Sequence, residues 1–283
     1  MLRFSRGRSK ENKMSIKITT LGSTGTGKTC YLYAMANQMP LSSNGFTFGM
    51  EYGTDQFLAL NGGWENIEKG VWPCGTMTSD TYSFSCSYAS RPIADSELYD
   101  YKGGILTTRG DECDADRRTD LIGRMYDSIA LIICISAYDL KSLSDDYIDI
   151  DLQQIFYAYR RLLQNSSDTQ GKTIPVIFAI TKSDLITKKD FENGINSLRN
   201  HVFAPLFVNG GGWFVGFVPV SIGQIDKGVI CPRNVEIPIL FGVKNYLESV
   251  FNGTTLVKDA LASIDRAFVK SDVTLYSNGI QCL

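Results

Sequence analysis

The stretch that decides the expected fold is "SIKITTLGSTGTGKTCYLYAM", residues 15–35. It opens with an apolar run, residues 16–21, that has the length and composition of a buried β-strand. It closes in a periodic run over residues 28–39, which predicts a helix stopped by Pro40. A glycine-rich turn joins the two runs. The stretch therefore predicts a strand, a tight loop and a helix in direct succession.

The turn from Gly22 to Thr29 fits the Walker A pattern G-x-x-x-x-G-K-[ST]. Glycines let successive backbone N–H groups turn inward as an anion nest, to which the following helix adds its positive end. Lys28 is expected to reach the β- and γ-phosphates, and Thr29 to offer its hydroxyl to Mg²⁺. The alternative is a flexible turn that binds nothing. The other expected contacts of the nucleotide in this loop are Ser23, Thr24, Gly25, Thr26, Gly27 and Cys30.

A second motif, Thr181-Lys182-Ser183-Asp184, follows the apolar run 174–180. The Asp184 carboxylate can accept hydrogen bonds from N1–H and the 2-amino group of guanine, whereas adenine would leave it unpaired. Recognition by buried polar pairing discriminates strongly between bases. Lys182 is expected to lay its aliphatic stem over the base and ribose. The alternative is an ordinary capping aspartate after a strand.

Strand-like and helix-like runs alternate from residue 15 to about residue 250. Apolar runs at 128–136, 174–180 and 213–221 are typical of strands covered on both faces. In the run 81–88, aromatic or cysteine side chains alternate strictly with threonine and serine. This alternation predicts a strand at an antiparallel edge, paired with residues 96–101. Helices are expected at 116–126, 148–164, 188–200 and about 239–250. The pattern predicts a three-layer α/β fold of the P-loop NTPase (Ras-like) type, with a mostly parallel sheet and one antiparallel edge strand.

The order of these elements over residues 15 to about 250 resembles that of TRAFAC-type P-loop GTPases. In this resemblance Thr181-Lys182-Ser183-Asp184 corresponds to [NT]-K-x-D, and Asp100-Tyr101-Lys102-Gly103 to D-x-x-G. The resemblance implies GTP or GDP as ligand and Mg²⁺ as cofactor. It also implies that Asp100 holds Mg²⁺ through water and that the N–H of Gly103 meets the γ-phosphate.

Two weaker correspondences complete the resemblance. The threonine of switch I that caps Mg²⁺ would be Thr76 or Thr78, and the spacing does not decide between them. Ser221 and Ile222 would occupy the loop whose backbone contacts guanine O6. The long loop, the run "WPCGT" (72–76) and "EIPILFGVKNYLESVF" (236–251) are further similar to bacterial double-GTPases of conflict systems.

One departure from the superfamily concerns hydrolysis. Many of these GTPases place a glutamine directly after D-x-x-G to orient the attacking water, and Gly104 stands there. Slow hydrolysis is therefore expected, completed by Arg109, Arg117 or Arg118 or by an arginine of a partner. The alternative for Arg117 and Arg118 is a solvated first turn of a helix.

The chain divides into a basic flexible arm (1–14), a GTPase domain (15–251) and a C-terminal extension (252–283) with a short helix near 255–269. Residues 41–80 are expected to form a long, switch I-like loop. Phe57, Trp64 and Trp72 within this loop are expected either to pack on the domain or to form a surface only when GTP orders the loop.

Composition narrows the class of protein. The 283 residues are 43% hydrophobic and carry a net charge of −2, which gives no reason to expect sequence-specific nucleic-acid binding. Neither a signal peptide nor a transmembrane run is expected. Seven scattered cysteines and one histidine indicate reduced thiols in the cytoplasm rather than a zinc site. Cys30 is expected to pack, with burial opposing the lowering of its pKa by the helix end.

Three hypotheses of function follow. The first is a GTP-driven switch with slow hydrolysis, whose nucleotide state is read by a protein effector at residues 41–80 and 101–115. The second is an interaction module that holds GTP or GDP without significant hydrolysis. The third, an ATP-dependent enzyme, is disfavoured by Asp184. A homo-oligomer is left open.

Overall fold

The structure, a computed structural model, describes residues 15–41, 43–74, 79–101, 112–141, 156–161, 174–208, 213–223, 230–250 and 253–283. The predicted basic arm (1–14) and most of the helix predicted at 148–164 lie outside these residues. Within them, the expected alternation of strands and helices is present, and the α/β class with a mostly parallel sheet is confirmed.

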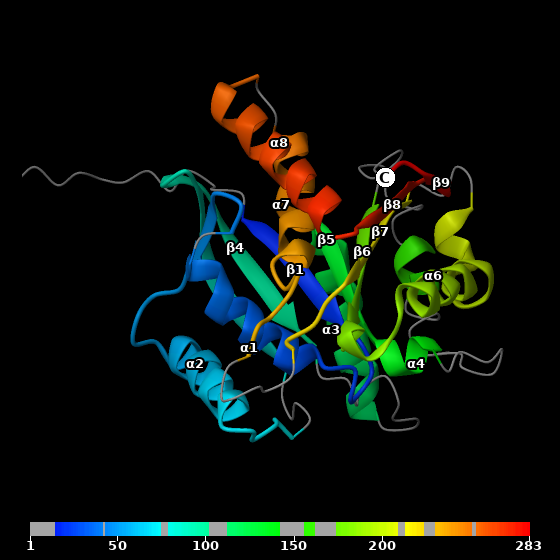
Figure 1. Ribbon diagram of the computed structural model, residues 1–283, viewed down its shortest axis with the longest axis horizontal. Coiled ribbons are helices and arrows are strands. Elements are labelled where there is room, and N and C mark those ends of the chain that lie inside the picture. Colours follow the sequence, from blue (N-terminus) through cyan, green and yellow to red (C-terminus); the bar gives the residue numbers. More distant parts are fainter. Residues whose placement is uncertain are drawn as a thin grey trace, which may run out of the picture.

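The centre of the sheet is parallel. Its spatial order is β4 (Arg91–Asp100), β1 (Ile16–Leu21), β5 (Ala130–Ser136), β6 (Ile174–Thr181) and β7 (Trp213–Pro219), as Figure 1 shows. Every residue of β5 is buried, as its continuous apolar run predicts. Because the carboxyl ends of parallel strands meet at one edge, the loops that follow β1, β4, β6 and β7 share that edge. These loops carry the predicted phosphate-binding motif, the motif that begins at Asp100, the base-recognition motif, and Ser221 with Ile222.

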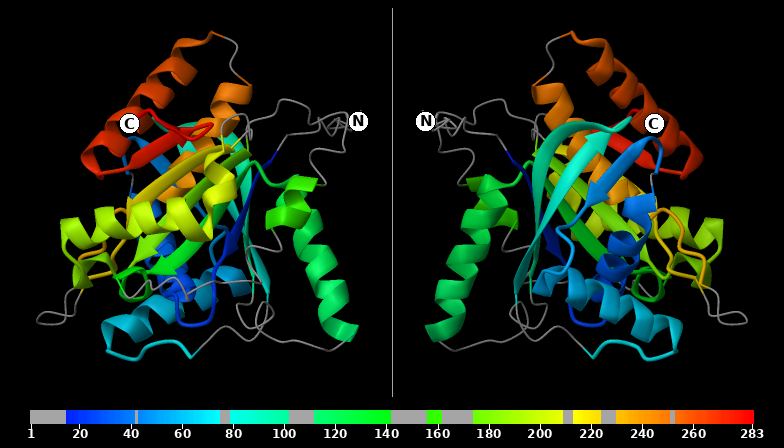
Figure 2. Two further views of the ribbon diagram at one scale, coloured as in Figure 1. Left: turned by 90° about the vertical axis from the view of Figure 1, so that its right-hand side faces the viewer. Right: turned by 90° about the vertical axis from the view of Figure 1, so that its left-hand side faces the viewer.

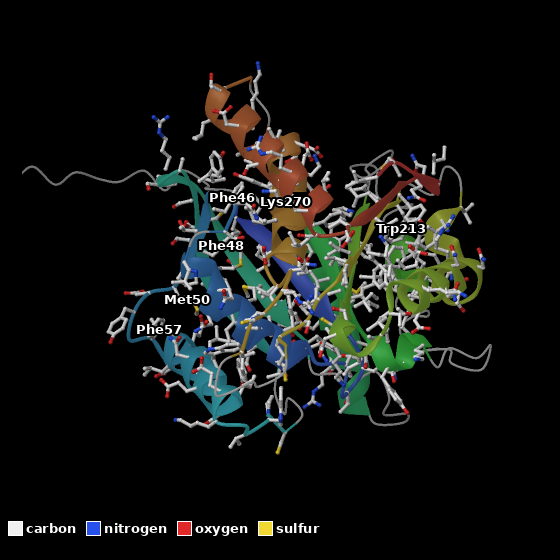
Figure 3. The ribbon with its side chains drawn as sticks, viewed as in Figure 1. Phe46, Phe48, Met50, Phe57, Trp213 and Lys270 are labelled. Carbon is white, nitrogen blue, oxygen red and sulfur yellow. The ribbon has the colours of Figure 1, made fainter. Side chains whose placement is uncertain are left out.

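Antiparallel strands extend both ends of this sheet in the described part of the chain. β3 (Asp80–Tyr88) and β2 (Phe46–Gly49) follow β4 outward, while β8 (Thr274–Ser277) and β9 (Ile280–Gln281) follow β7. The expectation of one antiparallel strand at the edge of the sheet, residues 81–88, is therefore wrong in this detail. The strand β3 is antiparallel as expected, but it lies inside the sheet and β2 forms the edge. A four-residue strand is too short for its alternation to stand out in sequence, although Phe46 and Phe48 are both buried (Figure 3).

Helices cover both faces of the sheet. One core contains side chains of α1 (Lys28–Gln38), α2 (Asp55–Glu68), α7 (Ile237–Ser249) and α8 (Thr255–Lys270). The other contains side chains of α3 (Glu112–Asp127), α4 (Ala137–Lys141) and α6 (Lys188–Ser197). Figure 2 shows α3 and α8 on opposite sides of the sheet, which gives the predicted three layers. Short turns of other helical types are η1 (Met39–Leu41), η4 (Ser183–Leu185), the π-helical η5 (Leu198–Val202) and η6 (Ala204–Phe207).

The expectation of a long loop over residues 41–80 is wrong for its first part, which contains β2 and the 14-residue helix α2. Thr54 caps α2 by accepting a hydrogen bond from the N–H of Phe57 (3.2 Å). Trp64 is buried against the domain, as one of the two alternatives predicted. Gly62 and Gly63 weaken the helical signal in the sequence. Gly63 faces α1 closely, because a Cβ there would lie 2.4 Å from the ring of Tyr33.

The C-terminal residues are more than an appended helix. α8 buries Ala260, Ile264, Ala267 and Phe268 in the same core as α1 and α7. β8 pairs antiparallel with β7, from Phe214↔Ser277 to Phe217↔Thr274. Residues 253–283 therefore complete the sheet and its helical cover.

Candidate functional site

The loop between β1 and α1 has the backbone that its glycines predict. Gly22 and Gly27 have φ values of 147° and 83°, a region that side-chain-bearing residues avoid. Gly22 also lies against β5, since a Cβ there would approach the carbonyl oxygen of Cys134 to 2.6 Å. Gly27 begins α1 without a side-chain cap, and no acidic residue occupies the first turn of that helix. The first N–H groups of α1 are thus suited to an anion.

Lys28 lies within this loop and is only 5% exposed. Its Nζ donates a hydrogen bond to the carbonyl of Gly22 (2.7 Å) and a longer one to that of Ser23 (3.4 Å). Burial lowers the pKa of Lys28, while the charge of Asp100 acts in the opposite direction. A desolvated ammonium group without a bonded carboxylate is a strong attractor for phosphate.

The remaining predicted residues of the loop occupy different environments. Thr26 is buried, and its Oγ1 donates to the carbonyl of Ser23 (2.8 Å). Thr24 and Gly25 are exposed at the apex of the turn, and Thr29 is half-buried in the first turn of α1. Cys30 is also half-buried, and burial raises its pKa despite the nearby charge of Lys182, as expected.

Asp100 ends β4 beside β1, with Thr20 as its parallel partner. The side chain is 1% exposed, and neither carboxylate oxygen has a hydrogen-bond partner among the described residues. Burial raises the pKa of Asp100 to about 7, with Lys28 lowering it and Asp80 raising it. A buried carboxylate with both oxygens unpaired is costly unless a cation or water satisfies it.

Asp80 is a neighbour of Asp100 that the sequence did not single out. A two-residue turn at Ala89 and Ser90, both with positive φ, joins β3 to β4. A regular hairpin would place Asp80 opposite Tyr99, but the register shifts between Cys86 and Ser87 and pairs Asp80 with Asp100. Such a bulge cannot be read from the alternation of the strand alone.

These carboxylates bear on the predicted Mg²⁺ site. Among the described residues, no group of three or more His, Cys, Asp or Glu could enclose a metal ion by itself. Asp100 with its orphaned oxygens and the hydroxyl of Thr29 fit a cation that also binds phosphate oxygens. The predicted residues Thr76, Thr78, Gly103 and Arg109 lie outside the described residues.

The base-recognition motif lies directly against the phosphate loop. β6 ends at Thr181, whose Oγ1 donates to the carbonyl of Thr26, 155 residues earlier, and to that of Ile135 (3.2 Å). Lys182 adopts φ 54°, and its Nζ donates to the carbonyl of Gly25 (3.0 Å). The two loops are therefore joined by side chain-to-backbone hydrogen bonds.

Asp184 is positioned by Ser221. The Ser221 hydroxyl donates to Oδ1 of Asp184 and accepts from the N–H of Gly223 (2.8 Å). Ser221 is 1% exposed, and its backbone exchanges two hydrogen bonds with Arg233 (3.1 and 2.7 Å). Only a backbone role was expected for Ser221. Its side chain was missed because nothing in the sequence shows that the loop after β7 meets the loop after β6.

A cavity of about 520 Å³ connects these loops. Its walls are mostly apolar, and among the described residues Asp184 is the only acidic one that lines it. The lining side chains and glycines are Gly27, Cys30, Tyr31, Trp72, Thr181, Lys182, Asp184, Leu185, Val220, Ile222 and Gly223. The predicted phosphate loop, base motif and Ile222 thus meet around one cavity. An apolar cavity with a few convergent polar groups is typical of small-molecule sites.

A second cavity, about 580 Å³, lies beside α6 and the C-terminal strands. Its lining includes Phe191 and Leu283 but no residue of the phosphate loop. Although this second cavity is larger, the residues of the predicted phosphate loop and base-recognition motif line the 520 Å³ cavity.

Arg117 does not line either cavity. It is an exposed residue of α3, and its carbonyl accepts a hydrogen bond from the hydroxyl of Tyr101 (3.3 Å). The backbone of Arg117 therefore lies beside the residue that follows Asp100. Arg118, the next candidate, is half-buried.

No protein-family model matches the sequence, and no curated protein matches it. Among solved structures, the chain is similar to the GTP-bound Ski7 GTPase-like domain of S. cerevisiae (15% identity over 90% of this chain and 50% of that one, TM-score 0.44). It is also similar to the bacterial selenocysteine-specific elongation factor EF-Sec (14% identity, 85% and 30%, TM-score 0.39). A third similar structure is the signal recognition particle receptor SRb-GTP/SRX complex of Chaetomium thermophilum (13% identity, 82% and 98%, TM-score 0.41). The chain spans half or less of the Ski7 and EF-Sec chains, and all three likenesses are weak.

Proposed function

We propose that this chain is a GTP-binding molecular switch with slow, Mg²⁺-dependent GTP hydrolysis that gates the binding of a partner protein. The observation that carries the proposal is the hydrogen bonding of Thr181 and Lys182 to the carbonyls of Thr26 and Gly25. It joins a phosphate-type loop and a guanine-type motif into one site. A nucleotide can then lie with its phosphates in the loop and its base at Asp184.

The phosphate end of the proposed site has two cationic contributions. The uncapped start of α1 presents backbone N–H groups and the positive end of the helix dipole. Lys28 adds a buried charge held by the carbonyls of Gly22 and Ser23. Exposed residues of the loop, including Thr24 and Gly25, would wrap the β-phosphate with their N–H groups.

The base end explains the choice of guanine. Ser221 holds one oxygen of Asp184, which leaves lone pairs of the carboxylate for N1–H and the 2-amino group of guanine. Adenine offers no matching pair of donors, so it would leave the carboxylate unsatisfied. The stem of Lys182, which lines the cavity, would cover one face of the base.

Thr29 and Asp100 would hold Mg²⁺, which neutralises phosphate charge when bound. Asp100 would do so through water, because its oxygens are buried and have no protein partner among the described residues. Gly103 and one of Thr76 and Thr78 would complete the γ-phosphate end.

Hydrolysis is proposed to be slow because Gly104 cannot orient the attacking water. An arginine would then complete the reaction, with Arg117 the candidate whose backbone lies beside Tyr101. A bound γ-phosphate would bias the segments after α2 and after Asp100, which a partner protein reads. Membership of the conflict-system double-GTPases is part of this proposal.

The second candidate function is a module that holds GTP or GDP without hydrolysing it. It is favoured by the same glycine at position 104. The two functions share the binding site and differ only in turnover.

We place the protein in the cytoplasm on the basis of its scattered cysteines. Six of the seven cysteines, Cys30, Cys74, Cys86, Cys134, Cys231 and Cys282, are free thiols in the structure. No helix in the described residues combines the length and apolar character needed to cross a bilayer.

Titration calorimetry with GTP, GDP and ATP in the presence of Mg²⁺ tests the proposal. We expect binding of both guanine nucleotides and no comparable binding of ATP. At 100 times its dissociation constant, each bound nucleotide should also raise the free energy of unfolding by about 2.7 kcal/mol. Equal binding of ATP would contradict the guanine site. Release of radiolabelled phosphate from GTP then separates the switch from the holding module.

A further inference from the structure

Asn234 joins the loop after β7 to the end of α8. Its side-chain amide donates to the carbonyl of Pro219 (2.8 Å) and to the carbonyl of Ser271 (3.2 Å), which uses both donors of its NH₂ group. Its backbone φ is 59°, a left-handed conformation that asparagine adopts more readily than most residues. The backbone and the two hydrogen bonds together hold this side chain in one orientation.

A short chain of hydrogen bonds connects Asn234 to the carboxylate proposed to read the base. The adjacent Arg233 exchanges two backbone hydrogen bonds with Ser221 (2.7 and 3.1 Å). The Ser221 hydroxyl donates to Oδ1 of Asp184. Pro219, which accepts from Asn234, lies two residues before Ser221. Asn234 therefore holds both sides of the antiparallel bridge that contains Ser221.

The other end of the connection is anchored in the core. Ser271 follows α8 directly, and its N–H donates to the carbonyls of Ala267 (3.1 Å) and Phe268 (3.2 Å). Ala267 and Phe268 are buried, and the chain then enters β8, which pairs with β7 (Figure 1). Moving Ser271 would disturb this packing. The C-terminal residues are thus the fixed partner, and the loop after β7 is the part that they position.

The cavity of about 580 Å³ lies between these two parts. Its wall contains Ser183 and Pro219 from the base loops, Val273 and Thr274 from the C-terminal residues, and Asn234. Side chains that face a cavity lack packing partners on that side. Packing across this gap is therefore incomplete, and a side chain that bonds to both parts contributes more to holding them together.

We propose that Asn234 is a positioning residue for guanine recognition, which transmits the fixed position of the C-terminal residues to Ser221 and through it to Asp184. This inference rests on the proposed function. It gives residues 253–283 a part in selecting the base, although none of these residues, all of them described, lines the 520 Å³ cavity. Without the amide of Asn234, the Asp184 carboxylate would lose its fixed direction and keep its charge. The expected effect is therefore on base selectivity.

The ratio of the affinities for GDP and inosine diphosphate (IDP) measures this role. Inosine lacks the 2-amino group of guanine, so the ratio reports the hydrogen bond between that group and Asp184. Asn234→Gly removes the side chain, and glycine accepts the left-handed backbone without strain. We expect the GDP-to-IDP affinity ratio, measured by calorimetry, to fall by about 3- to 10-fold, which corresponds to one weakened hydrogen bond.

Two further variants serve as a second test and as a control. Asn234→Asp keeps the shape of the side chain but replaces the donating amide group with an acceptor oxygen, so it should also lower the ratio. It provides the test if Asn234→Gly does not fold. The control is Asn278→Gly, because Asn278 has φ 48° and its N–H donates to the carbonyl of Trp213 (3.0 Å), at the other end of β7. That variant should keep the wild-type ratio.

Combining Asn234→Gly with Ser221→Ala tests whether the effect passes through Ser221. Ser221→Ala should itself lower the ratio, and Asn234→Gly should lower it no further in that background. Additive effects of the two changes would overturn the proposal.

An unchanged ratio in Asn234→Gly and Asn234→Asp, with only a lower melting temperature, would also overturn the positioning role and would leave the proposed function intact. A wild-type protein that binds no guanine nucleotide, or that binds GDP and IDP equally, would instead overturn the proposed guanine recognition itself.

Discussion

Lys182 donates a hydrogen bond from its Nζ to the carbonyl of Gly25, 157 residues earlier in the chain. This bond lies on the exposed side of the contact, whereas the bond from Thr181 to Thr26 beside it is buried. The two bonds fix the loop after β6 against the loop after β1. A ligand that binds one loop is thereby placed relative to the other.

The first prediction concerns the edge of the base. Asp184→Asn should weaken GDP binding by about 100-fold or more, because an amide group presents a donor where guanine also presents donors. The same variant should gain affinity for xanthosine diphosphate, whose edge carries a carbonyl in place of the 2-amino group. Competition calorimetry with the two nucleotides measures both effects. Glu192→Gln, an exposed change on α6, is the control and should leave both affinities unchanged. Normal GDP binding by Asp184→Asn would show that this carboxylate does not read the base.

The second prediction concerns Ser221. Removing its hydroxyl in Ser221→Ala deprives Asp184 of a donor and the N–H of Gly223 of its acceptor. We expect guanine affinity to fall by about 10-fold and the free energy of unfolding to fall by about 1–3 kcal/mol. Ser221→Thr keeps the hydroxyl and should restore affinity if its extra methyl group is accommodated. If Ser221→Ala loses stability yet binds GDP as wild type does, the hydroxyl is structural and does not position Asp184.

Sequence alone predicted the parallel centre of the sheet well, because β1, β5, β6 and β7 are long apolar runs with clear ends. The motif order also predicted that Lys28, Thr181 and Asp184 lie at one edge of the sheet. In the structure Thr181 and Asp184 line one cavity, and Thr181 bonds to the loop that precedes Lys28. It failed where the signal was short or depended on tertiary contact. Gly62 and Gly63 masked α2, and β2 is four residues long. Asp80 could be placed opposite Asp100 only through a bulge.

The third prediction follows from Asp100. Its pKa in the folded protein, about 7, lies above the ordinary value of 3.8, so the folded state holds this proton more tightly than the unfolded chain does. The stabilisation is complete below about pH 4 and is lost as the pH rises through about 7. It amounts to at most about 4 kcal/mol at 1.36 kcal/mol per pKa unit.

Asp100→Asn tests the direction of this pH dependence, because an amide does not titrate. In protein free of nucleotide and metal, we expect the variant to gain stability relative to wild type as the pH rises from about 5.5 to about 8.5. Thermal unfolding followed by circular dichroism measures the difference. With GDP and Mg²⁺ at neutral pH the order should reverse, since the wild-type carboxylate then has a cation to satisfy it. A constant difference between the two proteins across this pH range would mean that Asp100 is ionised throughout.

The fourth prediction uses the two adjacent glycines of α2. At Gly63 a Cβ would lie 2.4 Å from the Tyr33 ring, whereas at Gly62 nothing lies within 4 Å. Gly63→Ala should therefore lower the free energy of unfolding by about 1–3 kcal/mol through overpacking. Gly62→Ala should raise it by about 0.5–1 kcal/mol, because alanine favours the helix. Urea unfolding of the two variants provides a matched pair in one helix.

A double-mutant cycle with Tyr33 tests whether the ring causes the effect at Gly63. Tyr33→Ala removes the ring that opposes Gly63, so Gly63→Ala in that background should cost much less than in wild type. The difference between the two costs is the coupling energy of the α1–α2 contact. Equal costs in both backgrounds would mean that the ring simply rotates away and that α2 is held by Gln56 and its own buried side chains. Because Trp72 follows α2 directly, a loosened α2 should also weaken nucleotide binding in Gly63→Ala and leave Gly62→Ala unaffected.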